Sequence, residues 1–331
     1  MKYILDKKGL LVVLIALALL FPLVVPNQYY IHILTLAFIW TIAVYGLNLL
    51  SGFTGYLSLA HAGFFAIGAY SLGLLTVKAG MGFWPAFFLA PLITSVIGFF
   101  IGMAALRTKE HFFAIYTLCV GYIIYLVIDK WDSLTEGVRG LMGIPAPGNI
   151  GPISLSSPLA QYYFVFAVLL LVILVVYRIV HSLTGRSYIA IRNSEQLAQS
   201  LGISPIKNKM ASFVLSTFFA GVAGALYASF IRFIGPEIAY TTITFDLLTY
   251  MIVGGIGTLS GPLIGTLLIV WLSQNLQFLQ DYRMLIFGPL LTLLIIFSPG
   301  GIVGAFRNWQ FNRQEKKRLY TASLKKQAQE G

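Results

Sequence analysis

The chain has 331 residues, of which 58% are hydrophobic and only 10% are charged. An average soluble domain has about 25% charged residues, so this composition excludes a water-soluble fold and indicates a membrane protein. The formal net charge of +11 does not indicate nucleic-acid binding, because the basic residues lie between apolar runs and at the chain ends without a nucleic-acid-binding module. We expect a single membrane domain over residues 1–304 and a basic cytoplasmic tail over 305–331.

Apolar windows of about 20 residues are long enough to cross the roughly 30 Å hydrocarbon core of a bilayer. Ten windows of this kind are predicted, near residues 10–25, 31–50, 57–77, 85–106, 111–128, 161–180, 210–232, 240–256, 259–279 and 284–304. The first resembles a secretory signal, but its length and the spans that follow favour a membrane helix. The sequence therefore predicts an all-α membrane protein, a polytopic bundle of about ten transmembrane helices with both termini cytoplasmic.

The basic residues support this topology, because Lys and Arg concentrate in cytoplasmic loops. With the N-terminus inside, only five of the 22 basic residues lie outside, namely Lys78, Lys130, Arg139, Arg232 and Arg283. Without the short span at 240–256 the basic tail would lie outside as well, which is the main reason to keep that span. The tail also carries aromatic residues, a composition suited to contact with anionic lipid headgroups.

Two connections are long enough to have structure of their own. The outer loop, 129–160, is rich in Gly, Pro and Ser and is predicted to be a structured lid. The cytoplasmic loop, 181–209, shows a helical pattern from Tyr188 to Leu201 and is predicted to hold a surface helix. The residues expected to share one face of that helix are Ile189, Arg192 and Gln196.

Small residues recur at helical spacing in three segments. They are Ser58, Ala62, Ala66, Ala69 and Gly73 in the first segment, Gly98 and Gly102 in the second, and Ala220, Gly224 and Ala228 in the third. Small side chains let helix backbones approach closely, so these faces predict a compact helical bundle.

Glycine clusters with hydroxyl residues interrupt the apolar pattern twice, as SGFTG at 51–55 and as GGIGTLSGP at 254–262. Paired interruptions indicate a transport path, because freed backbone groups are tolerated only against protein or water. The competing interpretation is two tight cytoplasmic turns between ordinary helices. The candidate site residues in and near these breaks are Asn48, Ser51, Gly52, Thr54, Gly55, Ser58, His61, Asp246, Gly254 and Gly255.

Two of these candidates carry alternatives of their own. His61 is either a ligand or proton relay, or a side chain hydrogen-bonded into the bundle. Asp246 is the only carboxylate placed inside a span, which makes it a functional candidate. It lies near the outer end of its predicted span, so the alternative places it among the headgroups.

Enzymatic motifs are missing from the sequence. It has no Gly-Lys dipeptide for a phosphate-binding loop and no His-Glu pair for a zinc-protease helix, and four histidines with one cysteine make a poor metal set. We therefore predict no catalytic residue, no metal site and no cofactor bound by this chain. If the protein uses ATP, another chain must hydrolyse it.

Several long motifs occur in one order along the chain. They are GLNLLSGFTGYLSLAHAGFFAIGAY at 46–70, GLMGIP at 140–145, GRSYIAIRNSEQLAQSLGI at 185–203, FFAGVAGALYA at 218–228 and GGIGTLSGPLIG at 254–265. With these motifs the sequence resembles the permeases of bacterial branched-chain amino acid ABC transporters, specifically the M-type half of the permease pair, from about Leu36 to Gly304.

The resemblance implies a permease subunit of an importer in the bacterial inner membrane. Its implied partners are a homologous second permease, two ATPase subunits that bind ATP-Mg, and an extracytoplasmic solute-binding protein. Alternating access would be driven by ATP hydrolysis, and the candidate residues near the two breaks would line the substrate path or the interface between the permeases.

The resemblance also implies that the cytoplasmic loop is a coupling helix docked on an ATPase. Its implied coupling residues are Gly185, Arg186, Arg192, Glu195, Ala198 and Gly202. The sequence departs from the family pattern at Pro205, which is displaced within SPIKNK, and at Glu136, where relatives often have a second glycine.

The substrate is left open, because permeases for urea and short amides share the same motifs. An ATP-independent secondary transporter or channel is the alternative from another class. Ion coupling would predict more carboxylates within the membrane than Asp246 alone. A membrane-embedded enzyme ranks third, since the sequence has no cluster of acids, bases or metal ligands.

Overall fold

The computed structural model describes residues 18–22, 27–108, 110–149, 154–275 and 300–305. Within these ranges the chain is almost entirely helical. The longer helices are α2 (Gln28–Leu47), α3 (His61–Gly73), α4 (Phe83–Ala105), α5 (Glu110–Lys130), α7 (Pro158–Val180), α8 (Leu183–Asn193), α10 (Pro205–Ile231), α11 (Thr241–Gly254) and α12 (Gly261–Asn275). The short elements are α6 (Asp132–Thr135), α9 (Glu195–Ser200), the π-helical segments η1 (Asn48–Thr54) and η2 (Leu74–Lys78), the 3-10 turns η3 (Gly137–Arg139) and η4 (Pro236–Ala239), and the strands β1 (Leu141–Met142) and β2 (Phe233–Ile234).

Eight of the predicted spans coincide with helices in the part of the chain that the structure describes. Five helical segments are long and apolar enough to cross a membrane: Gln28–Thr54, Phe83–Ala105, His111–Lys130, Pro158–Val180 and Pro205–Ile231. Helices α3, α11 and α12 are shorter. Most of the predicted first and tenth spans lies outside the described residues, although 18–22 and 301–305 are helical. The structure thus supports a helical membrane protein, and the count of ten spans stays a prediction.

The predicted span at 57–77 starts too early. Helix α3 begins only at His61, because Gly55 adopts a left-handed conformation with φ 83° and residues 55–60 then run without helical structure. Only glycine takes such a φ without strain. The second segment of the bundle is therefore half irregular and half helical, with the irregular half directly after the first glycine break.

Helix α10 lies at the centre of the bundle and packs against α2, α3 and α4. Glycines permit the close approach. A Cβ on Gly68 of α3 would lie 2.5 Å from the Cα of Gly221, and a Cβ on Gly224 would collide with the carbonyl oxygen of Phe65. A Cβ on Gly98 of α4 would likewise collide with Thr217. The small-residue faces predicted from the sequence are thus packing faces within this subunit.

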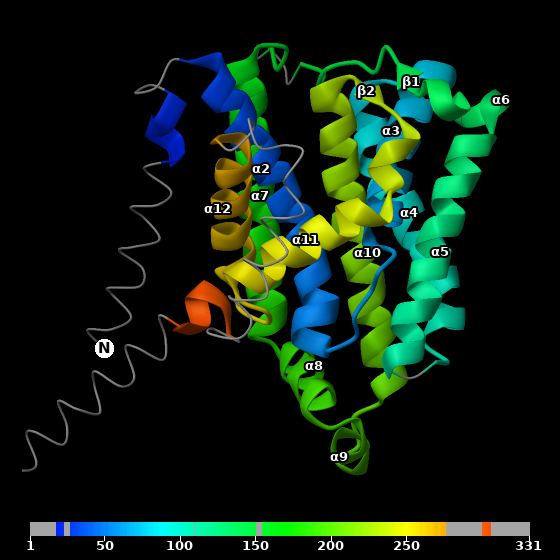
Figure 1. Ribbon diagram of the computed structural model, residues 1–331, viewed down its shortest axis with the longest axis vertical. Helices are drawn as coiled ribbons and strands as arrows, with labels where there is room; N and C mark the ends of the chain where they lie inside the picture. Colours follow the sequence, from blue (N-terminus) through cyan, green and yellow to red (C-terminus); the bar gives the residue numbers. More distant parts are fainter. Residues whose placement is uncertain (1–17, 23–26, 109, 150–153, 276–299, 306–331) are drawn as a thin grey trace, which may run out of the picture.

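The two ends of the molecule differ in structure. Strands β1 and β2 and helix α6 lie at one end, called the β1 end, and α8 and α9 lie at the opposite end, called the α9 end (Figure 1). At the β1 end, β1 pairs antiparallel with β2, with Leu141 opposite Ile234, and this pairing joins the loop after α5 to the loop after α10. The connection at 129–160 contains α6, η3 and β1 over its described residues, and its role as a lid stays a prediction.

The single helix predicted from Tyr188 to Leu201 is wrong. Helix α8 ends at Asn193, and Ser194 is extended, with φ −163° and ψ 111°. The Ser194 hydroxyl accepts a hydrogen bond from the Leu197 backbone N–H at 3.2 Å and so caps the start of α9. Because of this break, the shared face predicted for Ile189, Arg192 and Gln196 does not exist as one helical surface.

Candidate functional site

The two glycine breaks, about 200 residues apart in the sequence, meet in the structure. Asn48, fully buried at the start of η1, donates from Nδ2 to the Thr258 carbonyl oxygen at 2.9 Å. Its Oδ1 accepts from the Gly257 backbone N–H, also at 2.9 Å. Tyr45 adds a hydrogen bond from its hydroxyl to the Leu259 carbonyl oxygen at 2.7 Å. One buried amide thus ties the π-helical segment to the turn between α11 and α12.

Glycine is required where these segments touch. A Cβ on Gly52 would lie 2.8 Å from the backbone nitrogen of Gly257, and Gly257 itself has a φ of 68°. Gly255 has a φ of 126°, and a Cβ on Gly254 would collide with the Gly261 carbonyl oxygen. The glycines of both breaks therefore serve close backbone contact as well as turning the chain.

The π-helical segment leaves backbone groups that need partners from outside the helix. The buried Thr54 hydroxyl donates to the Ser212 hydroxyl at 2.8 Å, and Ser212 in turn donates to the Leu49 carbonyl oxygen at 3.2 Å. Single π-helical turns occur often at functional sites, since they re-aim the chain within a helix. Helix α10 thus holds the first break through a pair of hydroxyls.

Arg192 joins the α9 end to both breaks. Its Nη1 donates to the Gly52 carbonyl oxygen at 2.5 Å, and its side chain packs against Gly55. A Cβ on Gly257 would collide with the same guanidinium. Arg192 was assigned to an ATPase contact from the family resemblance. The structure directs its guanidinium toward the chain's own breaks, although the residue is exposed.

A second tie, which sequence reasoning missed, links α9 to the segment after the first break. Lys209 of α10 is only 3% exposed, and its Nζ lies 2.6 Å from Oε2 of Glu195. The Tyr56 hydroxyl donates to the same carboxylate oxygen at 2.8 Å, and Lys209 also donates to Tyr56. Burying an ammonium is costly unless it is paired, so this cluster fixes the start of α9. A lysine among the basic residues of a cytoplasmic loop gives no sequence signal of its burial.

These ties border a hollow of about 450 Å³ at the α9 end. It opens between the segment after the first break and the junction of α8 and α9, and its wall includes Thr54, Gly55, Tyr56, Arg192 and Glu195. The hollow places two of the six coupling candidates, Arg192 and Glu195, and the first break around one space.

The other coupling candidates have separate structural roles. Ala198 is buried, and a Cβ on Gly185 would collide with the Val180 carbonyl oxygen, so both positions require small residues. Gly202 has a φ of 81°, and a Cβ on it would meet no atom within 4 Å, so it ends α9 in open space. Arg186 is exposed on α8. Their role in docking an ATPase stays a prediction.

His61, Ser51 and Ser58 lie inside the subunit. His61 is 1% exposed, and its Nε2 lies 2.8 Å from the Ala43 carbonyl oxygen, so this nitrogen carries the proton. The Ser51 hydroxyl donates to the Tyr56 carbonyl oxygen at 3.2 Å. The Ser58 hydroxyl is buried without a partner in the described part of the chain. In this conformation the side chains of His61 and Ser58 face the interior of the bundle, whereas Ser51 is partly exposed.

Asp246 lies apart from the breaks, in the interior of α11. It is half-buried and lines a separate hollow together with Trp40 of α2 and Gln274 of α12. Helix α11 runs obliquely between the β1 end and the α9 end (Figure 1), and both interpretations of Asp246, as a functional residue within the membrane or as a side chain among the headgroups, stay predictions.

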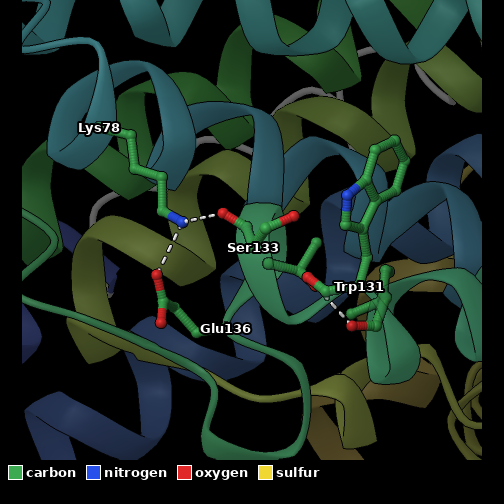
Figure 2. Close-up of polar contacts among 6 residues, drawn as sticks. Lys78, Trp131, Ser133 and Glu136 are labelled. Atoms are coloured by element: carbon green, nitrogen blue, oxygen red, sulfur yellow. Dashed lines mark hydrogen bonds and ion pairs between the residues drawn. The ribbon is translucent and has the colours of Figure 1, made fainter.

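At the β1 end, Lys78 holds the outer loop. Its Nζ lies 2.7 Å from Oε1 of Glu136 and donates to the Ser133 carbonyl oxygen at 2.8 Å, as Figure 2 shows. The ammonium of Lys78, hydrogen-bonded to this carboxyl, lowers the pKa of Glu136. Nearby, the Thr135 hydroxyl donates to the Ile128 carbonyl oxygen at 2.6 Å. The loop is thus fastened to the end of η2.

Within the described ranges, no group of three or more His, Cys, Asp or Glu side chains is arranged to hold a metal ion. The arrangement contains apolar membrane-length helices, two glycine breaks that contact each other, and polar ties from these breaks to the α9 end. Such a fold defines a transport protein embedded in a membrane.

Comparison with known proteins identifies the kind of transport protein. Residues 29–297 match the family described as branched-chain amino acid transport system / permease component, and the chain belongs to this family. The chain is 32% identical to the high-affinity branched-chain amino acid transport system permease protein LivM of Salmonella typhimurium, over 90% of this chain and 75% of the relative. LivM of Escherichia coli gives the same identity and coverage.

LivH of Escherichia coli, another high-affinity branched-chain amino acid permease protein, is 25% identical over 82% of this chain and 92% of its own length. The greater identity to LivM supports assignment of the chain to the M-type permeases. No solved structure matches the chain. The chain is a transport permease component and not an enzyme.

Proposed function

We propose that this chain is the membrane-spanning subunit of an ATP-driven importer of branched-chain amino acids, working by alternating access. It pairs with a homologous second permease, as LivM and LivH relatives suggest. Two ATPase subunits bind ATP-Mg at the α9 end, and an extracytoplasmic binding protein delivers substrate at the β1 end. Residues 1–304 form the permease domain with about ten spans, both termini are cytoplasmic, and the bacterial inner membrane holds it.

The observation that carries the proposal is the pair of polar ties between the α9 end and the first break. A subunit that receives force from an ATPase needs a contact between its docking segment and the part that opens. Arg192 supplies such a contact to Gly52, and Glu195 supplies one to Tyr56. Both donors and acceptors are fixed within the fold, so displacement of α8 or α9 would displace the break.

The glycine breaks supply the part that opens. A zwitterionic amino acid cannot cross hydrocarbon without polar partners, so its route needs irregular backbone inside the protein. The segment from Asn48 to Ala60 offers a π-helical turn followed by six residues without helix. We expect this segment and the turn at 255–260 to move together, since Asn48 binds both of its partners there.

The experiment purifies the chain in mild detergent together with its proposed partner subunits, the second permease and the ATPases. Leucine uptake is then measured in proteoliposomes that contain the purified complex. The proposal predicts ATPase subunits in stoichiometric amount and uptake that requires ATP and the binding protein. Full uptake by the permease without ATPases would contradict it and favour a secondary transporter or channel. If the transporter takes up urea or acetamide with ATP but does not take up leucine, the assignment as an ATP-driven importer stands and the assignment of branched-chain amino acids as the substrate is wrong.

A further inference from the structure

A second hollow, of about 190 Å³, lies between α2, α11 and α12, away from the coupling residues. It is smaller than the pockets of about 300–1,000 Å³ that hold drug-sized ligands, so a ligand of this hollow must be small. Helix α11, which forms one wall, crosses the molecule between the β1 end and the α9 end (Figure 1). The hollow shares no lining residue with the hollow at the α9 end.

Asp246 contributes a carboxylate to the wall of the hollow. Elsewhere in the described ranges, carboxylates lie at helix ends or in connections, whereas Asp246 lies in the interior of an apolar helix. A carboxylate at such a position is expensive unless a cation or hydrogen-bond donors accompany it. A carboxylate has about four lone-pair sites, so Asp246 can accept from an ammonium group beside any hydrogen bond it makes within the subunit.

The remaining wall combines apolar and polar groups. Leu36 and Ile243 supply aliphatic surface, and Trp40 supplies an aromatic face that attracts cations. Trp40 is held in place by stacking on Phe65, with ring centroids 4.9 Å apart. On α12, Gln274 offers amide donors, and the buried Ser273 hydroxyl has no partner in the part of the chain that the structure describes.

We propose that this hollow is a binding site for a small amino acid with an apolar side chain. Asp246 accepts from the ammonium group, Ser273 and Gln274 donate to the carboxylate, and the wall of Leu36 and Ile243 contacts the side chain. The inference rests on the proposed function and deepens it, because the neutral N–H groups of urea or acetamide bind a carboxylate more weakly than an ammonium group does. The charge of Asp246 thus selects amino acids over short amides.

The hollow is connected to the breaks through α11. Asp246 lies nine residues before Gly255, or about 14 Å along the helix axis at 1.5 Å per residue. The turn that begins at Gly255 is tied to Asn48. Movement of this turn would therefore move α11, and with it Asp246 in the wall of the hollow.

The test introduces Val270→Cys, at a wall position that makes none of the proposed contacts, into the full chain after Cys119, the only native cysteine, is replaced by serine. Membrane vesicles holding the complete transporter are labelled with cationic aminoethyl methanethiosulfonate or anionic sulfonatoethyl methanethiosulfonate. We compare the ratio of the cationic to the anionic labelling rate at this cysteine with the same ratio for a free thiol in solution. The ratio at this cysteine should be about tenfold larger, because a charged cleft concentrates ions of the opposite charge. Asp246→Asn should abolish this preference, and Asp246→Glu should retain it.

Protection by small molecules tests the ligand class in the same vesicles with Asp246 intact. Leucine and isoamylamine, which carry an ammonium group and a branched alkyl chain, should slow labelling, whereas isocaproate, urea and acetamide should not. Absence of labelling, equal preference in the Asp246→Asn variant, or equal protection by isocaproate would overturn the proposal. The assay needs neither ATP nor ATP hydrolysis, so its failure is distinct from failure of ATP-driven uptake.

Discussion

Glu136 is the one carboxylate of the outer loop whose backbone is strained. Its φ is 62°, a conformation that L residues other than Asn and Asp rarely adopt, and the residue stands between α6 and η3. The strain is accompanied by the ion pair with Lys78, whose two side chains are 33% and 41% exposed. An exposed ion pair contributes little, so backbone strain outweighs it at this position.

Glycine and glutamine at position 136 are therefore expected to act in opposite directions. Glu136→Gly relieves the strained φ and should raise the thermal unfolding midpoint of the detergent-purified protein slightly. Glu136→Gln keeps the strain, loses the charge and should lower the midpoint slightly. A lower midpoint for the glycine variant than for the glutamine variant would show that the ion pair outweighs the strain.

The same ion pair predicts a pH dependence of the outer loop. Since Lys78 lowers the pKa of Glu136 in the folded protein, the ion pair stabilises the loop above the ordinary carboxyl pKa. This contribution is lost as the pH falls through the lowered pKa. Hydrogen-exchange protection factors for residues 132–142 should decrease over that acid range in the wild-type protein but not in Glu136→Gln. A parallel decrease in both proteins would assign the effect to another group.

At the scale of elements, the crossing of α3 and α10 depends on missing side chains. Gly224 faces the carbonyl oxygen of Phe65 so closely that a methyl group has no space. In a membrane, helices associate through such close packing, because lipid offers apolar groups as good an environment as another helix does. The crossing therefore determines where α3, and with it the first break, lies against α10.

Gly224→Ala should lower the free energy of unfolding by about 1–3 kcal/mol, the usual cost of overpacking. Gly82→Ala is the matched control, since a Cβ there would lie 3.9 Å from its nearest neighbour, Pro85 Cδ, and its φ of −59° suits alanine. Unfolding in detergent, followed by circular dichroism, compares the two. Equal stability of both variants would mean that α3 can move away from α10 at no cost.

For the whole molecule, apolar length and small-residue spacing were enough to predict most helices and their packing faces. These two signals did not predict the break between α8 and α9. The helical sequence pattern continues across Ser194, and the two helices are separated only by the extended backbone of this residue. The meeting of Asn48 with Thr258 was also out of reach, since pattern alone cannot pair side chains 210 positions apart. The burial of Lys209 depends on partners from two other elements and left no local sign.

We propose that Arg192 transmits movement of the α9 end to both breaks. The most direct measurement is the number of leucine molecules transported per ATP hydrolysed by the reconstituted transporter. Loss of a hydrogen bond from a charged group costs about 1.5 kcal/mol at an exposed site, or roughly tenfold in an equilibrium. We expect the Arg192→Ala transporter to keep its ATPase subunits and its ATP hydrolysis but to transport about tenfold less leucine per ATP. The control is Arg178→Ala, at an exposed arginine near the end of α7, which should behave as wild type. An unchanged ratio of leucine to ATP in Arg192→Ala would contradict it.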